Sequence, residues 1–122
     1  MDNSQQYPFA HHQLEVYALA LRMAKLAKTV AEKVPRGYRN YADHLKRSSG
    51  NTVLLIGEGA NRFTAGMKRQ RYEEALGEAG EVAVAAEVAV TLGLVSRGDV
   101  VELLGIAGRV CAMLSRLVRR HR

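Results

Sequence analysis

The sequence predicts an all-α protein, and three observations carry that prediction. Ala, Leu, Glu, Lys and Arg, which favour helices, dominate the 122-residue chain. Both prolines precede residue 36, so residues 36–122 lack the strongest helix breaker. Apolar residues recur at helical spacing in four stretches that turn residues separate. Because a chain of this length provides for a single core, we expect one domain, residues 13–122, after a loose leader of residues 1–12.

The leader is polar before any apolar stretch begins, which is not the pattern of a signal peptide. We therefore expect a cytoplasmic protein, with the leader docked at most through Tyr7 and Phe9. The adjacent His11 and His12 do not share a helix face, and no cysteine or acidic cluster accompanies them. A solvated histidine pair is therefore expected, and not a metal site.

The first helix is expected over residues 13–34. Its apolar stripe comprises Leu14, Tyr17, Leu21 and Ala24, widened by Val16, Ala20, Met23, Ala27, Val30 and Val34. Arg22, Lys25 and Lys28 line the opposite side. Pro35 and Gly37 end the helix, because a residue before proline leaves the α region and glycine permits a turn.

The second helix is expected over residues 38–61, and its small residues predict close packing. The buried line comprises Tyr38, Tyr41, Leu45, Ser48, Ser49, Thr52, Ile56 and Gly59. Gly50, Gly57 and Gly59 each cost about 1 kcal/mol of helix propensity relative to alanine, which packing has to offset. A short buried strand over residues 53–56 is the alternative. The glycines around Glu58 match neither a P-loop nor a dinucleotide fingerprint, so no nucleotide site is expected.

The third helix is expected to begin at Ala65 or Lys68 and to end at Leu92, with Thr64 and Gly93 as its caps. Alternating valines within residues 82–95 are compatible with a strand. The alanines between those valines are poor strand formers, and the flanking segments have helical patterns. A helix is therefore the prediction for the whole stretch.

The fourth helix is expected over residues 96–118, where Ser96 and Asp99 form a capping box. Thirteen of the nineteen residues 100–118 are apolar, far more than one stripe needs, and residues 82–95 are similarly apolar. Burying the remainder requires a second copy, so we expect a homo-oligomer. Cys111 is expected to be a buried hydrophobe, and three charged residues of this region exclude a membrane span.

Charge is unevenly distributed along the chain, whose net charge is +6. Residues 36–71 hold eight Lys or Arg and two Asp or Glu. Residues 72–108 hold one Lys or Arg and seven Asp or Glu, and residues 109–122 hold five Lys or Arg and no Asp or Glu. Such segregation allows one face to attract a polyanion while another pairs with a neighbouring element. The basic tail can equally complement the dipole of the last helix.

Several motifs carry a resemblance to a known family. They are Leu45-x-Arg47, Ile56-Gly57-Glu58-Gly59-x-x-Arg62 and Tyr72-x-x-Ala75-Leu76-Gly77-x-x-x-Glu81, with Leu14-x-Val16-Tyr17, Pro35-Arg36-Gly37-Tyr38 and Leu92-Gly93-Leu94. Over residues 13–118 the chain resembles the four helix bundle protein family, bacterial proteins encoded in intervening sequences of 23S rRNA, and their relatives. Leu55, Gly57 and Glu78 depart from its pattern, which has Asn, Ala and Ser there.

The resemblance implies an antiparallel up-and-down four-helix bundle that assembles into a ring-shaped homopentamer. It also implies partners, since related bundle proteins bind a reverse transcriptase and nucleic acid through a basic surface. Within such a ring, every weak basic face is repeated, so that affinity can arise from multivalency.

The charge pattern and the resemblance together favour a non-catalytic accessory protein that binds RNA or DNA through phosphate contacts. The expected contact residues are Arg36, Arg39, Lys46, Arg47, Arg62, Lys68, Arg69, Arg71, Arg116, Arg119 and Arg120. Little base specificity is expected, because no aromatic cluster accompanies the charges. Arg47 and Arg62 alternatively pair with Glu58 or with the acidic face of a neighbouring subunit. An enzyme is not expected, because no set of nucleophile, base and orienting residue is recognisable.

The alternative function is a protein-interaction scaffold. Glu74, Glu78 and Glu81 share one face of the third helix, which would meet the basic centre of another subunit or of a foreign protein. No histidine stands at the spacing of a di-iron bundle site. We therefore expect a solvated or salt-bridged acidic face, and neither a metal nor a cofactor.

Overall fold

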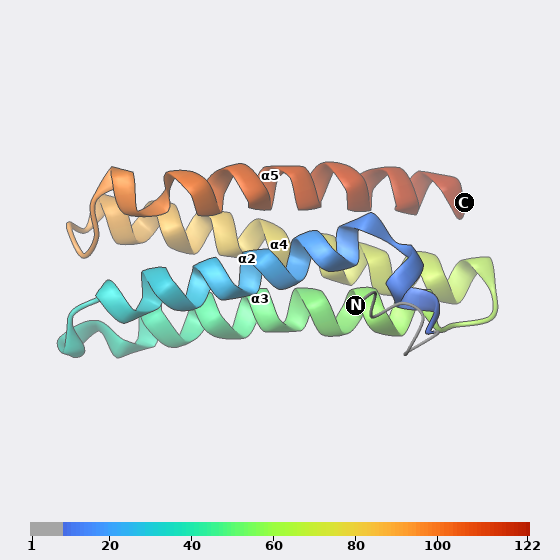
Figure 1. The fold of residues 1–122 in the computed structure, drawn as a ribbon, viewed down its shortest axis with the longest axis horizontal. Helices are drawn as coiled ribbons and strands as arrows, with labels where there is room; N and C mark the ends of the chain where they lie inside the picture. The colour runs from blue at the N-terminus through green and yellow to red at the C-terminus, as the bar shows by residue number, and fades with distance from the viewer. Residues whose placement is uncertain (1–8) are drawn as a thin grey trace, which may run out of the picture.

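Four α-helices form the chain in the computed structural model, which describes residues 9–122. They are α2 (Glu15–Lys33), α3 (Arg39–Ala60), α4 (Ala65–Thr91) and α5 (Arg97–Arg120), with two short 3-10 helices, η1 (Ala10–Gln13) and η2 (Arg36–Tyr38). Successive helices run in opposite directions, and α2 packs against both α3 and α5 (Figure 1). This confirms the all-α, up-and-down four-helix prediction. Residues 9–122 contain no strand, so the strand alternative for residues 53–56 is wrong.

The helix α2 packs through a different face from the one expected to dominate. Its buried residues are Val16, Leu19, Ala20, Met23, Ala27, Val30 and Ala31. Leu21 is 47% exposed, and Tyr17 and Ala24 are only half-buried. The residues predicted to flank the apolar stripe therefore form most of the packing face. The residues predicted to form its centre lie at the edge of that face.

The helix α3 buries small and polar residues along its inner face, as predicted for Ser48, Ser49 and Thr52. Two of these hydroxyls are satisfied within the helix: Thr52 Oγ1 donates to the carbonyl of Ser48 at 2.8 Å, and Ser49 Oγ donates to the carbonyl of Lys46 at 3.1 Å. Tyr38, expected in this buried line, is instead 45% exposed. It belongs to η2, before the helix begins, so the helical periodicity does not apply to it.

Close packing of a glycine occurs at one of the three predicted positions in α3. A Cβ atom at Gly59 would lie 2.6 Å from Cε1 of the buried Tyr72 on α4. At Gly50 and Gly57 a Cβ atom would meet nothing within 4 Å among the described residues. The prediction is therefore confirmed at Gly59, and within a single subunit it is wrong at the other two.

Three predicted helix ends are confirmed in detail. Thr64 Oγ1 accepts a hydrogen bond from the amide of Met67 and caps α4. Ser96 and Asp99 form the expected reciprocal capping box at the start of α5. Gly93 has a φ of 72°, and Leu94 donates to the carbonyl of Ala89, which is the pattern of a Schellman motif after α4. None of the helices in the described part of the chain is long and apolar enough to cross a membrane.

Candidate nucleic-acid interface

The basic residues predicted to contact nucleic acid do not form one patch. Arg36 and Arg39 lie at the end of the bundle where α2 connects to α3 and α4 to α5 (Figure 1). We call this the opposite end. The C-terminal end holds η1, the α3–α4 loop of residues 61–64 and the last turns of α5. With 22 residues, α3 separates the two ends by about 33 Å.

Most of the remaining predicted residues gather at the C-terminal end. They are Arg62, Lys68, Arg69, Arg71, Arg116, Arg119 and Arg120, from the α3–α4 loop, the first turns of α4 and the last turns of α5. Lys46 and Arg47 lie apart from both groups, on α3. Lys46 approaches Asp43 at 3.7 Å, and Nη2 of Arg47 lies 3.2 Å from Nδ1 of His44.

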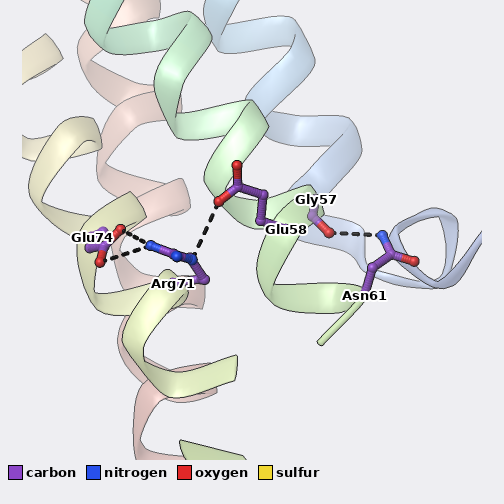
Figure 2. Close-up of polar contacts among 5 residues, drawn as sticks. All are labelled: Gly57, Glu58, Asn61, Arg71 and Glu74. Atoms are coloured by element: carbon purple, nitrogen blue, oxygen red, sulfur yellow. Dashed lines mark hydrogen bonds and ion pairs between the residues drawn. The ribbon is translucent and has the colours of Figure 1, made fainter. Parts of the chain in front are cut away.

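Two of these cations are used within the fold. Lys68 Nζ donates to the carbonyl of Ala60 at 2.9 Å and to that of Gly59 at 3.4 Å, so it satisfies the C-terminal carbonyls of α3. Arg71 lies between two carboxylates (Figure 2). Its Nη1 donates to Glu74 at 2.8 Å and its Nε lies 3.4 Å from Glu58. These contacts tie α3 to α4.

The partner of Glu58 is therefore Arg71. The alternative that Arg47 or Arg62 pairs with Glu58 is wrong among residues 9–122, where neither forms an ion pair with it. Arg69 Nε lies 3.8 Å from Glu73 on the exposed face of α4, a contact that contributes little to stability. Counting Lys and Arg in the sequence therefore overstates how many cations of the first turns of α4 are available to bind a ligand.

The segment before α2 is packed against the C-terminal end. Nδ2 of Asn61 donates to the carbonyl of Gly57 at 2.8 Å (Figure 2) and lies 3.0 Å from Nδ1 of His11. The rings of His11 and Tyr17 have their centroids 4.6 Å apart, and Phe9 stacks on His11 at 5.4 Å. The histidines are therefore half-buried in an aromatic cluster, and the solvated pair predicted in the leader is wrong. Residues 1–8 of that leader lie outside the described residues.

Burial lowers the pKa of His11, and repulsion from the neighbouring His12 lowers it further. The imidazole is consequently neutral near pH 7, and its Nδ1 can accept the hydrogen bond from the Asn61 amide. Sequence reasoning missed this contact, although the aromatic side chains of Phe9 and Tyr17 on either side of the histidines were a readable signal.

Five arginines at the C-terminal end have no carboxylate within ion-pairing distance among the residues that the structure describes. They are Arg62, Arg116, Arg119, Arg120 and Arg122. Arg116 and Arg120, one turn apart on α5, line a pocket of about 490 Å³ together with Gln13 and the first turn of α2. Glu15 also lines this pocket. We refer to these five residues as the arginine cluster.

The comparison with known proteins decides the family. A family model described as 23S rRNA-intervening sequence protein matches residues 12–116. The chain belongs to this family. No curated protein matches the chain. The name of the family refers to an RNA, the 23S rRNA, and it states no activity.

The motif that resembles the 23S rRNA-intervening sequence proteins is mainly structural in this chain. Ile56 is buried, Gly59 admits the ring of Tyr72, and Glu58 pairs with Arg71. The last residue of the motif, Arg62, belongs to the arginine cluster. The motif therefore fixes the α3–α4 junction and places one unpaired cation at its end.

The acidic face of α4 is partly engaged within the subunit. Glu74 pairs with Arg71, and Glu81 accepts from Ser48 Oγ at 3.4 Å and lies 3.8 Å from Nε2 of His44. In the described chain no group of three His, Cys, Asp or Glu side chains is placed to hold a metal ion. Cys111 is half-buried, less than predicted, and burial raises the pKa of its thiol.

Proposed function

We propose that this chain is a non-catalytic, oligomeric protein that binds RNA or DNA through phosphate contacts at the C-terminal end of the bundle. The arginine cluster is the observation that supports this proposal. Arginines without an internal partner remain available to a polyanion, whereas Lys68 and Arg71 do not. The RNA-related name of the family agrees with a nucleic-acid ligand.

The cluster suits phosphate better than a single carboxylate. Guanidinium groups bind phosphate oxygens in a bidentate manner, and five of them spread over a loop and a helix end can follow a strand of phosphates. Each phosphate contact makes the plot of log K against log salt concentration steeper, because it adds about −0.7 to −0.9 to the slope. The opposite end offers fewer such residues: Arg36, Arg39 and Arg97.

Oligomerisation is the second part of the proposal, and surface glycines support it. Gly50, Gly57, Gly77, Gly80, Gly105 and Gly108 lie within helices, and a Cβ atom at each would meet nothing within 4 Å in the described chain. Each glycine costs about 1 kcal/mol of helix propensity relative to alanine, with no close packing among the described residues to offset that cost. The exposed Leu54 and Val101, each 64% accessible, lie on the same helices. Close approach of another copy would account for both features.

The arrangement we propose for the copies is the ring-shaped homopentamer that the family resemblance implies. In a ring, the arginine cluster of every subunit occupies an equivalent position. Binding of one strand to several clusters would then be intramolecular after the first contact, which raises affinity without new residues.

Two matched triple variants test the nucleic-acid surface. One changes Arg116, Arg119 and Arg120 to Gln, and the other changes Arg36, Arg39 and Arg97 to Gln. Both lower the net charge by the same amount. Binding of a structured RNA and a DNA duplex is measured across a salt series. We expect weaker binding and a shallower salt slope for the first variant alone, because it removes phosphate contacts.

Two outcomes contradict the proposal. If the wild-type protein binds neither nucleic acid at low salt, the nucleic-acid function is wrong. If the two variants weaken binding equally, the attraction is a general effect of net charge and the C-terminal end is not the interface.

A protein-interaction scaffold remains the second candidate, supported by an apolar pocket between α3 and α4. This pocket of about 410 Å³ is lined by Tyr41, His44, Glu81, Val88 and their neighbours. The test is a pulldown after nuclease treatment with wild type and with a Val88→Asp variant of unchanged oligomeric mass. A protein partner that wild type recovers and the variant does not would favour this function. A change of mass in that variant would instead assign the pocket to a subunit contact.

A further inference from the structure

Phe63 is the most exposed large apolar side chain that the structure describes, at 97% accessibility. It lies in the α3–α4 loop at the C-terminal end (Figure 1). Exposing an aromatic ring to water forgoes the stabilisation that its burial would provide. Among the described residues nothing covers this ring, so a ligand that covers it would compensate for its exposure.

The loop holds Phe63 in place on both sides. Asn61 is bonded to the Gly57 carbonyl and approaches His11, and Thr64 caps the first turn of α4. The exposure of Phe63 is therefore built into an anchored loop. Because the loop backbone is already ordered, binding has to fix only the side-chain rotamer of Phe63.

We propose that Phe63 stacks on an unpaired base, so that the nucleic acid bound at the C-terminal end is single-stranded at the point of contact. This rests on the proposed nucleic-acid function. Proteins that bind single strands combine cations along the phosphates with aromatic rings on which bases stack. Arg62 precedes Phe63, and the rest of the arginine cluster lies at the same end. Bases within a duplex are stacked on one another and offer no free face.

A protein partner is the competing occupant for an exposed phenylalanine, and the charge disfavours it. Residues 109–122 carry five arginines and no acidic residue, and they end at the same end of the bundle as the loop that presents Phe63 (Figure 1). Met67, in the first turn of α4 and 41% exposed, is a further accessible apolar side chain at this end of the bundle. Cations with a flat apolar group among them match the alternation of phosphate and base in a single strand.

The chain contains no tryptophan, so Phe63→Trp introduces a unique fluorophore. We expect a single-stranded oligonucleotide to quench its emission, and an abasic oligomer with the same number of phosphates to bind without that quenching. The matched control is Leu92→Trp, because Leu92 is also exposed but lies at the opposite end. Its emission is expected to stay unchanged with either oligomer.

Phe63→Ala gives the affinity test. Its affinity for the single strand is expected to fall roughly 5- to 150-fold, the effect of one lost stacking contact, with an unchanged salt slope and unchanged affinity for the abasic oligomer. If Phe63→Ala binds the single strand as tightly as wild type, stacking is wrong while the arginine surface stands. A change of oligomeric mass in Phe63→Ala would assign the ring to a subunit contact and also overturn the inference. If wild type binds none of these oligomers, the proposed function itself has failed.

Discussion

Gly59 is the glycine of α3 at which α4 packs most closely, because the ring of Tyr72 occupies the space that a Cβ atom would need. A Cβ atom at position 59 would lie 2.6 Å and 2.9 Å from two ring carbons of Tyr72 and 3.2 Å from Cβ of Arg71. The ring of Tyr72 is almost fully buried, so moving it away from position 59 would disturb the side chains packed around it.

We therefore expect Gly59→Ala to destabilise the protein by about 1 to 3 kcal/mol in urea unfolding, despite the better helix propensity of alanine. Tyr72→Leu removes the ring carbons that would collide. The double variant is expected to lose less stability than the sum of the two single changes. Wild-type stability of Gly59→Ala would show that α3 and α4 can separate at no cost.

Individual side-chain roles were only partly readable from the sequence. The pairing of Arg71 with Glu74 follows from their spacing of three on one helix. The carbonyl partners of Lys68 and the pairing of Arg71 with Glu58 join different helices. The phase of one helix against the next decides such contacts, and no local pattern encodes it. The sequence therefore supplied the candidate cations but could not separate structural ones from available ones.

Helix ends were predicted more accurately than helix faces. The caps at Thr64, Gly93 and Ser96 depend on a few neighbouring residues, and all three are present. The buried face of α2 depends on where α3 and α5 lie against it. Alanines and larger apolar residues together cover more than one stripe of α2, so the sequence alone allows two overlapping faces, and the one with more alanines is buried.

Asp99 links the start of α5 to the end of α2. Its Oδ1 accepts from Lys33 Nζ at 2.9 Å and its Oδ2 accepts from the amide of Ser96 at 2.8 Å. The hydrogen bond from Lys33 is the largest cause that lowers the pKa of Asp99, from 3.8 to about 2. The hydrogen bonds with Ser96 also contribute to that lowering of the pKa. Because the folded pKa is below the ordinary one, the ionised carboxylate stabilises the fold above about pH 4 and this contribution is lost as the pH falls towards 2.

An Asp99→Asn variant lacks this titration. We expect wild type to lose more stability than Asp99→Asn between pH 4 and pH 2, measured by thermal unfolding. Lys33→Met is the control that keeps the capping box and removes only the link to α2, and it should show an intermediate pH dependence. Parallel curves for wild type and Asp99→Asn would show that the acid sensitivity arises elsewhere.

The folded bundle distributes charge in a way that the sequence order hides. Residues 36–71 are one basic stretch along the chain, yet an up-and-down bundle sends their two ends to opposite ends of the molecule. The same topology brings Arg62 and the basic tail, more than fifty residues apart, to one end (Figure 1). Counting charge along the sequence finds the basic segments, but it predicts one patch where the fold forms two separate groups.

The surface glycines distinguish a lone bundle from an assembly. In a lone subunit, Gly105→Ala and Gly108→Ala fill open space on α5 and would stabilise the helix by about 1 kcal/mol each. In the proposed assembly, another copy packs closely on these positions, and the added methyl groups would hold the two backbones apart. We expect the double variant to have a lower mass than wild type in light scattering at the same concentration, with unchanged helical circular dichroism. Gly66→Ala, at another open helical glycine, is the control that should keep the wild-type mass. An unchanged mass together with a higher unfolding temperature in the double variant would mean that this face of α5 lies in solvent.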